Sequence, residues 1–341
     1  MPRGNFWEAT FDPDWNGPVE EASLTGLAGS SGLVQRRIVA ADGKPVSVKW
    51  RKRDNTPRHF QKCDFRLEVR DSYVSDCTFS GCRFRDSTWQ GVKFSNCTFQ
   101  NCDFSGMTLI RCHFLSDCQF VANSASAELF RIQDTAVSAL EFISGLRTNL
   151  EHLPSWTTAE YQRSRFIGTK QKIAKALYSA TRDEADLEYF YQAYEELVRC
   201  TLDQGVELHR FKGETRERNS QWEFAKRSFP ARVERSIVLL SAWLTNWGRS
   251  VFRACLFLVA VVVVFAGLYA TIDPRCGSAG ALHVIGRALL EAVNITLVAG
   301  YTAYFRDGAP LLDRVLWVVN LALGLFWYSL IIPVLSRRIL R

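Results

Sequence analysis

The stretch from Val74 to Phe114 reads VSDCTFSGCRFRDSTWQGVKFSNCTFQNCDFSGMTLIRCHF, and a large apolar residue returns in it at every fifth position. These positions are Val74, Phe79, Phe84, Trp89, Phe94, Phe99, Phe104, Leu109 and Phe114. A period of five fits neither an α-helix, which repeats about every 3.6 residues, nor a strand, which alternates about every two. It predicts a stacked repeat in which each coil buries its large residues against those of the next coil.

The cysteines keep the same phase, because most of them stand two positions before a large apolar residue. They are Cys63, Cys77, Cys82, Cys97, Cys102, Cys112 and Cys118, seven of the ten in the chain. A C-x4-C spacing would also suit zinc, but the histidines are not paired with these cysteines. Small buried thiols are therefore the favoured interpretation, and we expect them to be reduced in a cytoplasmic location.

This pattern resembles the pentapeptide-repeat family over residues 60–120, apart from a break between Phe65 and Val74. The resemblance implies a right-handed, four-sided β-helix with four pentapeptides in each coil. The repeat centres and the residues two before them then point inward. Nine units make little more than two coils, so we expect flanking segments to cap the ends.

Some members of that family resemble DNA and bind gyrase through long acidic helices. Here the segment from Phe60 to Phe120 carries seven basic and seven acidic side chains. Such a balance argues against DNA mimicry, and we expect no nucleic-acid partner. The net charge of +7 is spread along the chain and suits contact with anionic lipid near an inner leaflet.

Two further regions surround the repeat. Residues 1–59 carry short apolar patches that predict a few strands, with a hairpin at the turn Asp42-Gly43. The run Lys49 to Arg53 (KWRKR) suits a phosphate or a lipid headgroup, although a solvated basic face is the favoured interpretation. Residues 123–232 predict a cytoplasmic helical connector.

The connector divides into three predicted helices. SASAELFRIQDTAVSALEFISGL keeps helical spacing to about Gly145, and a basic helix follows over Tyr161 to Ala180. The third begins with a capping box of Thr181 and Glu184 and ends at Gly205. Its apolar stripe predicts packing against a helix or a subunit.

Residues 233–341 predict a membrane domain. Ala254 to Ile272 and Val315 to Leu335 contain no charged residue, and each is long enough to cross a bilayer core as a helix. A buried core helix is the alternative for either run. Before the first run, we expect residues 233–248 to form an amphipathic helix on the inner membrane surface, with Trp243 and Trp247 at headgroup level.

The basic residues that flank the two runs set the expected orientation. They are Arg232, Arg235, Arg249, Arg253, Arg337, Arg338 and Arg341. By the positive-inside rule, both chain ends lie in the cytoplasm, as in a multi-pass protein of the bacterial inner membrane.

A shorter helix is predicted between the two spans, over His283 to Leu297, and Val298, Ala299, Gly300, Tyr301 and Thr302 follow it. Extended backbone at membrane depth must be buried in protein or lined by water. The order of span, short helix, loop and span resembles the pore module of two-span, potassium-channel-like ion channels, whose filter reads TVGYG. Only Gly300 and Tyr301 match that motif. Thr302 replaces the second glycine and Ala303 the usual acidic follower, so potassium selectivity does not follow from the resemblance.

The connector carries a second resemblance, to pentapeptide-repeat proteins that end in such a two-span channel module. Phe190, Tyr191 and Glu195 match its connector helix, and Gly248 and Arg253 match the motif before the first span.

The alternative to a pore loop for residues 276–310 is an extracytoplasmic linker with one interfacial helix.

The expected fold class is therefore mixed: a quadrilateral β-helix, an α-helical connector and a two-helix transmembrane pore module. The function this favours is a homotetrameric cation channel in the lipid bilayer, whose repeat region senses, assembles or binds a protein partner. It would suit a pore that dissipates ion gradients in stress or phage defence. The alternative is a membrane-anchored interaction scaffold that does not conduct.

Two residues of the second span stand out as candidates. Asn320 either lines the pore or hydrogen-bonds a neighbouring helix, and Gly324 is either a gating hinge or a close-packing position. The five histidines are scattered, and no nucleophile elbow or nucleotide-binding loop occurs. We expect no enzyme, no cofactor and no metal site.

Overall fold

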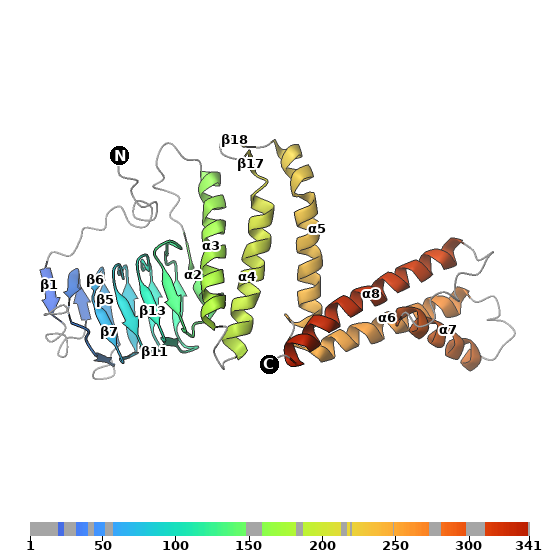
Figure 1. The fold of residues 1–341 in the computed structure, drawn as a ribbon, viewed down its shortest axis with the longest axis horizontal. Helices are drawn as coiled ribbons and strands as arrows, with labels where there is room; N and C mark the ends of the chain where they lie inside the picture. Colours follow the sequence, from blue (N-terminus) through green and yellow to red (C-terminus); the bar gives the residue numbers. More distant parts are fainter. Residues whose placement is uncertain are drawn as a thin grey trace. The chain divides into compact units, whose positions relative to one another are not determined.

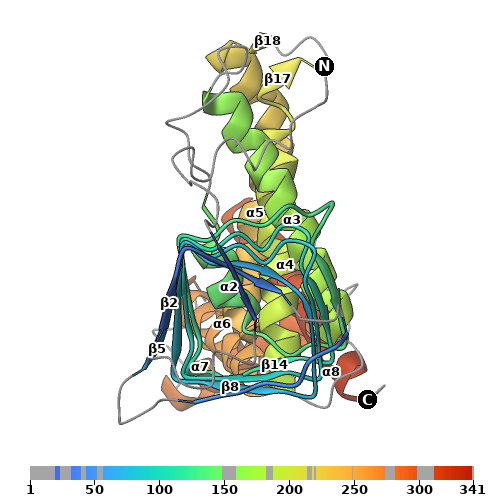
Figure 2. The same ribbon diagram turned by 90° about the vertical axis from the view of Figure 1, so that its left-hand side faces the viewer.

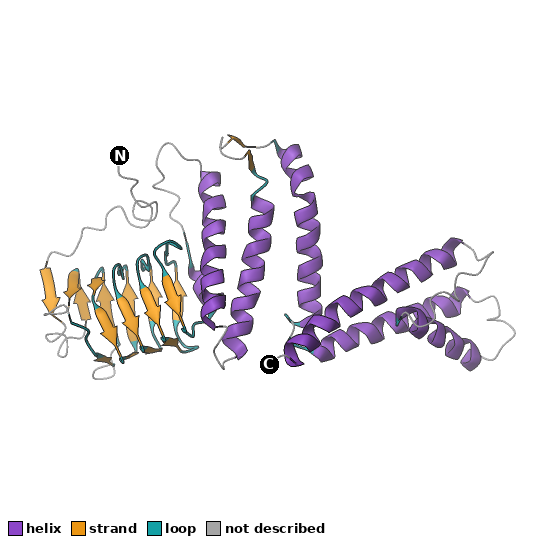
Figure 3. Ribbon diagram, viewed as in Figure 1, coloured by secondary structure: helices purple, strands orange, loops and turns teal. Residues whose placement is uncertain are grey.

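The computed structural model describes residues 20–23, 32–39, 44–51, 57–147, 159–181, 187–212, 217–218, 220–247, 249–272, 281–297 and 311–339. The chain divides into two compact units, Met1–Val233 and Glu234–Arg341. Strands dominate the start of the first unit and helices follow (Figures 1 and 3). Each unit is described by itself.

Parallel strands of the first unit wind into a coil with a four-sided outline (Figure 2). One face holds β2 (Gly32–Val34), β5 (Arg58–Gln61), β9 (Cys77–Ser80), β12 (Thr98–Gln100) and β15 (Gln119–Val121). A second holds β7 (Glu68–Arg70), β10 (Thr88–Gln90), β13 (Thr108–Ile110) and β16 (Arg131–Gln133). A third holds β4 (Lys49–Trp50), β8 (Tyr73–Ser75), β11 (Lys93–Ser95) and β14 (His113–Phe114). The fourth holds β1 (Glu20–Ser23), β3 (Arg36–Val39) and β6 (Asp64–Arg66).

The strand register confirms the predicted β-solenoid. Trp89 pairs with Val69 in the preceding coil and with Leu109 in the following one, each 20 residues away, so one coil is four pentapeptides. Phe60 pairs with Phe79, 19 residues on. The break in the repeat before Val74 is therefore a deletion of one residue, which the coil absorbs without losing its register.

The repeat centres form the core of the β-helix. All eight predicted ladder residues are at most 3 % exposed: Phe79, Phe84, Trp89, Phe94, Phe99, Phe104, Leu109 and Phe114. On one face the rings of Phe60, Phe79, Phe99 and Phe120 stack with centroids 5.1, 5.0 and 5.2 Å apart. Burial of such large side chains is the main favourable contribution to folding of this unit.

The backbone conformation at the corners of the coil explains why Gly, Asn and Asp recur in the repeat. The residue three positions before each centre has a left-handed backbone, with φ from 44° to 79°, at nine successive corners. These residues are Asp71, Asp76, Gly81, Asp86, Gly91, Asn96, Asn101, Gly106 and Arg111. Gly, Asn and Asp tolerate this conformation better than other residues do. Arg111 is the one poorly suited side chain in this set.

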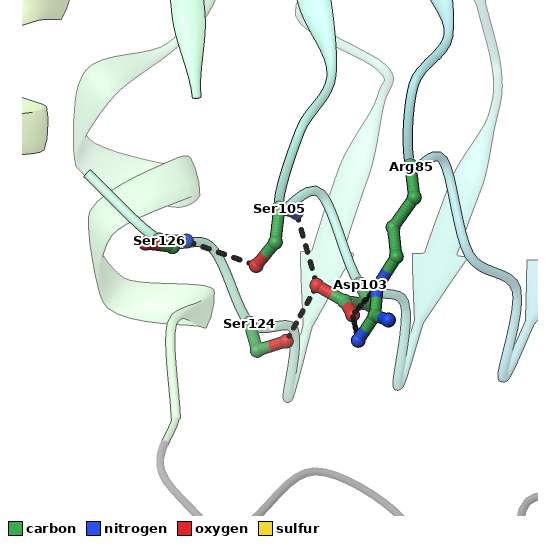
Figure 4. Close-up of polar contacts among 5 residues, drawn as sticks. All are labelled: Arg85, Asp103, Ser105, Ser124 and Ser126. Atoms are coloured by element: carbon green, nitrogen blue, oxygen red, sulfur yellow. Dashed lines mark hydrogen bonds and ion pairs between the residues drawn. The ribbon is translucent and has the colours of Figure 1, made fainter. Parts of the chain in front are cut away.

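One corner buries an ion pair (Figure 4). Asp103 is fully buried, and its Oδ2 accepts from both Nη2 (3.1 Å) and Nε (3.2 Å) of Arg85. Its Oδ1 accepts from the backbone N–H of Ser105 at 2.9 Å and from the hydroxyl of Ser124 at 3.3 Å. A carboxylate that is paired and hydrogen-bonded on both oxygens can be buried at modest cost. Asp103 is buried while Arg85 keeps a partly exposed side chain, and the contacts from Asp103 to Arg85 and Ser124 join successive coils.

The β-helix extends to the N-terminal side of the predicted boundary at residue 60. Ile38 lies opposite Phe65 in one face, and Trp50 lies opposite Val74 in another. The predicted hairpin is therefore wrong, because β3 pairs in parallel with β1 and β6, whereas Val46 and β4 pair in parallel with β7 and β8. Asp42 and Gly43 themselves lie outside the described residues. The alternation of apolar and polar residues in the sequence is the same for an antiparallel hairpin and for successive strands of a parallel coil.

The C-terminal end of the coil also extends past the predicted boundary. The segment expected to be helical from residue 124 includes β16, which pairs with β13, and helix begins only at α2 (Ala139–Gly145). Phe142 of α2 packs on Phe104, Phe120 and Phe130 with centroids 5.1 to 5.6 Å apart. This helix caps the aromatic core, as the repeat predicts, and covers the last strand edges.

Two long helices, α3 (Ala159–Thr181) and α4 (Leu187–Glu207), pack side by side beyond this cap (Figure 1). The Tyr189 hydroxyl donates to the Phe114 carbonyl at 2.9 Å, which ties α4 to the β-helix. The capping box predicted at Thr181 is wrong. Thr181 is the last residue of α3, and its hydroxyl donates backwards to the Leu177 carbonyl at 3.1 Å.

A short antiparallel hairpin of β17 (Phe211–Lys212) and β18 (Glu217–Arg218) leads to α5 (Gln221–Thr245). The surface helix expected over residues 233–248 is therefore the second half of one 25-residue helix. That helix ends at Asn246 and Trp247, which both have a positive φ. Left-handed residues of this kind commonly end helices.

The second unit contains α6 (Val251–Ile272), α7 (Ala281–Thr296) and α8 (Leu311–Ile339), which pack against one another. Both α6 and the first part of α8, Leu311–Ile332, are long and apolar enough to cross a membrane. The predicted spans lie inside these two helices. The predicted short helix corresponds to α7, and the loop of Val298 to Thr302 lies outside the described residues.

Candidate functional site

The site is built around the C-terminal end of α7. This helix is amphipathic, with Val284, Ala288, Ala292 and Ile295 buried on one face. That spacing gives one stripe of a helix, and its small alanines allow a close approach to neighbouring helices. The stripe packs into a cluster with Phe265 of α6.

A polar contact joins all three helices at this end of α7. Asn320 of α8 is fully buried, and its Oδ1 accepts from the hydroxyl of Thr296 at 2.8 Å. Its Nδ2 donates to the Tyr269 hydroxyl at 3.2 Å and lies 3.5 Å from the Ala292 carbonyl oxygen. We call Tyr269, Thr296 and Asn320 the polar hub. Of the two alternatives for Asn320, the contact with neighbouring helices is the one that the structure contains.

Gly324 lies one turn beyond Asn320 on α8. A Cβ atom at this position would lie 2.0 Å from the carbonyl oxygen of Thr296 and 2.8 Å from its carbonyl carbon. No larger residue fits without moving one of the two helices. Gly324 is thus a close-packing position, which was one of its two predicted roles.

Tyr328 completes this face of α8, one further turn along. Its hydroxyl donates to the carbonyl oxygen of Leu297 at 3.2 Å. Residues Asn320, Gly324 and Tyr328 are spaced by four, so they lie on one side of α8. Together they contact the last turn of α7 and the residue directly after it. A separate contact, from Trp327 Nε1 to the Ala254 carbonyl at 2.9 Å, joins α8 to the start of α6.

The electrostatics of this end follow from the helix itself. The C-terminal end of an α-helix carries a partial negative charge of roughly half an elementary charge, because its last carbonyl groups have no intrahelical donor. Among the described residues, the groups that contact these carbonyls are neutral: the Thr296 hydroxyl, whose one hydrogen lies between the Ala292 carbonyl and Asn320 Oδ1, the Asn320 amide and the Tyr328 hydroxyl. The partial negative charge is therefore not neutralised by these partners, and such an end favours a cation nearby.

Sequence reasoning found only part of this site. It singled out Asn320 and Gly324 but missed Tyr269, Thr296 and Tyr328. Two signals in the sequence could have found them: the spacing of four residues along Asn320, Gly324 and Tyr328, and the threonine hydroxyl in the last turn of the short helix. Glu291 and Arg287, also on α7, take no part in the hub contacts.

The cysteines of the β-helix serve its packing. Cys112 is 2 % exposed, and its thiol donates to the Trp89 carbonyl of the preceding coil at 3.1 Å. Cys82 and Cys102 make the same contact to Phe60 and Phe79. Burial raises the pKa of the Cys112 thiol to about 11. The Cys112 thiol therefore stays protonated at neutral pH. Among the described residues, no group of three His, Cys, Asp or Glu side chains is placed to hold a metal.

Comparison with known families gives a match in the repeat alone. The model of the family described as Pentapeptide repeats (9 copies) matches residues 75–120. Together with the strand register, this identifies the segment as pentapeptide repeats in a β-solenoid. A search of curated proteins finds no match to the chain.

Proposed function

We propose that the chain is one subunit of a cation channel, in which α6 and α8 cross a bilayer and α7 with the residues after it forms a re-entrant pore loop. The observation that carries the proposal is the position of α7. A helix of 16 residues is too short to span, yet it packs between two apolar helices and has its C-terminal end fixed among them. A helix in a hydrocarbon layer that stops part-way needs protein or water around the chain that follows.

The exposed surface of the second unit supports the bilayer location. Large apolar side chains cover α6 and α8, including Phe252 at 71 % exposure, Val263 at 59 % and Ile332 at 57 %. In a water-soluble unit, two such helices would bury most of their apolar side chains. In α6 and α8 most residues of the apolar segments are not buried. We propose the bacterial inner membrane, with both chain ends in the cytoplasm as the flanking basic residues predict.

A pore also requires several copies, because one α7 encloses nothing. Closed rings are the usual symmetric solution, and the resemblance to two-span channels favours four subunits. The pentapeptide-repeat unit then serves as a cytoplasmic assembly or sensing region, with room for a protein partner. A pore with a poorly matched filter suits a regulated dissipation of ion gradients, as in stress or phage defence.

The test is cation flux through purified protein in liposomes loaded with K⁺. The parent is compared with Gly300→Asp, which places a charge in the loop, and with Gly205→Asp in α4, a matched control where no neighbouring atom lies within 4 Å. The proposal predicts flux from the parent and the control, and changed or abolished flux from Gly300→Asp.

Silence of all three proteins, with the protein folded, inserted and monomeric, would favour the second function considered. That function is a tethered scaffold whose repeat unit binds a partner. Flux that is the same in Gly300→Asp as in the parent would overturn the placement of the pore loop.

A further inference from the structure

We infer that the face of α8 formed by Asn320, Gly324 and Tyr328 positions the pore loop, so that these residues control which cations pass although they touch no permeating ion. This rests on the proposed channel function. They are positioning residues, because they act through the end of α7.

The first step is that the end of α7 is fixed at three successive levels of α8. Asn320 accepts from Thr296, Gly324 meets the Thr296 carbonyl, and Tyr328 donates to the Leu297 carbonyl. At about 1.5 Å per residue, the eight steps from Asn320 to Tyr328 span about 12 Å of α8. The end of α7 therefore cannot move along α8 or turn on its axis without breaking one of these contacts.

The second step is that each contact is costly to lose. Thr296 and Asn320 are fully buried, and no water-exposed surface is left on either side chain to replace a missing partner. An unpaired buried polar group costs more than the net value of the hydrogen bond it made. The Thr296 hydroxyl also has the Ala292 carbonyl oxygen of its own helix within 2.6 Å, so the group that depends most on the hub is the Asn320 amide. Pairing of that amide favours one defined position for the end of α7.

The third step is proximity to the loop. Leu297, whose carbonyl accepts from Tyr328, is directly followed in the sequence by Val298, the first residue of the proposed filter segment. Because the two are adjacent in the chain, we expect a displacement of Thr296 and Leu297 to reach the loop. Discrimination between cations by backbone carbonyls depends on their number and geometry. A shift of α8 would then change selectivity and opening together.

The experiment has two readouts on reconstituted full-length protein. One is the K⁺ to Na⁺ permeability ratio from reversal potentials. The other is amide hydrogen exchange of residues 293–297, which reports the end of α7 whether or not the protein conducts. The variants are Thr296→Val and Tyr328→Phe, which each remove one hydroxyl with little change in shape, and Asn320→Leu.

The matched control is Ser329→Ala. Its hydroxyl donates only to the Phe326 carbonyl of its own helix at 2.6 Å, and the residue is exposed. We expect Thr296→Val to speed exchange at residues 293–297 by about tenfold and to change the permeability ratio, since it leaves the buried Asn320 Oδ1 without its donor. We expect Asn320→Leu to act in the same direction, since it removes the contacts to Thr296 and Tyr269, although the Thr296 hydroxyl keeps the Ala292 carbonyl as an acceptor. We expect Tyr328→Phe to act in the same direction more weakly, and the control to match the parent.

A double variant of Thr296→Val with Asn320→Leu gives a further check. If both residues act through one contact, the double variant will resemble a single one, because coupled sites are not additive. Unchanged exchange in Thr296→Val would overturn the inference even if Asn320→Leu fails to fold. Faster exchange with an unchanged permeability ratio would also overturn it. A parent that does not conduct would remove the channel function, while exchange would still decide whether α8 fixes the end of α7.

Discussion

The β-helix and the three C-terminal helices distribute the same side chains in opposite ways. In the β-helix, large aromatic residues lie inside: Phe99 is 1 % exposed and sits between Phe79 and Phe120. In the C-terminal unit, large apolar residues lie outside, and the fully buried positions include Thr296 and Asn320. The first arrangement suits water and the second suits lipid, where apolar surface costs nothing and polar groups must find partners within the protein. This contrast supports the proposed membrane location of the C-terminal unit.

The largest expected effect is the difference in unfolding free energy between two phenylalanine-to-alanine substitutions, one in each unit. Phe99→Ala removes a ring stacked on both sides and should lower the free energy of unfolding of the β-helix by about 3–5 kcal/mol. Phe252→Ala, at a position 71 % exposed on α6, should leave unfolding in detergent almost unchanged. Chemical denaturation followed by circular dichroism compares them. A large loss for Phe252→Ala would show that a protein contact covers it.

The buried ion pair gives the next largest effect. Asp103→Ala removes the acceptor of two Arg85 nitrogens, of the Ser105 N–H and of the Ser124 hydroxyl, and should cost about 1.5–3 kcal/mol in unfolding free energy. Asp117→Ala, at an exposed position, is the matched control and should cost far less. Equal midpoints in a denaturant titration would mean that the pair contributes nothing beyond its desolvation cost.

A glycine pair tests packing inside the C-terminal unit. Gly324→Ala places a Cβ 2.0 Å from the Thr296 carbonyl oxygen, so it should destabilise the unit by about 1–3 kcal/mol. Gly267→Ala, on α6 with no atom within 4 Å, should be neutral or slightly stabilising because alanine favours a helix. Thermal stability in detergent measures both. The same loss at the two positions would contradict the close approach of α8 to α7.

A smaller effect, of opposite sign, is expected at a corner of the β-helix. Arg111 has a φ of 50°, a conformation that costs a non-glycine residue about 1–2 kcal/mol. Arg111→Gly should therefore raise the melting temperature, whereas Arg131→Gly, on strand β16, should lower it. The prediction fails if both variants are destabilised, which would indicate that the Arg111 side chain makes a compensating contact.

The smallest effect is the pH dependence contributed by Cys112. Its pKa in the folded chain is about 11, above the ordinary value of 9.0, because burial disfavours the thiolate. The stabilisation is fully present below pH 9 and is lost as the pH rises through 11. Cys112→Ser keeps a donor and does not titrate, so its unfolding free energy should fall less over this range. If the unfolding free energy of the parent and of Cys112→Ser falls equally with pH over this range, the group that titrates is not Cys112.

The sequence predicts the repetitive part of the fold in detail. The period of five predicts a stacked repeat, and the family resemblance adds the inward residues and the coil of four pentapeptides. The left-handed corners were not predicted and are seen only in the structure. The first and last coils are harder to predict from the sequence, because strands such as β3 and β16 lack the period of five and their residues resemble a hairpin or helix pattern. Their place is decided by pairing with a neighbouring coil, which is a long-range interaction.

The candidate site shows the same limit. Hydrophobicity locates α6, α7 and α8 from local sequence, and the lone Asn320 indicates an important position. The partners Tyr269 and Thr296 lie 51 and 24 residues away, and only the packing of three helices brings them together. Gly324 could be recognised as a small residue but not assigned to a contact, because a hinge and a close approach need the same absence of a side chain.

The central claim is that copies of the C-terminal unit close around a pore. Subunit counting by native mass spectrometry of the protein in lipid nanodiscs tests this most directly, because it does not depend on the stimulus that opens the channel. The account predicts a particle of four 38.8 kDa chains. A single chain in each nanodisc, with α6 and α8 inserted, would contradict the pore and leave a tether.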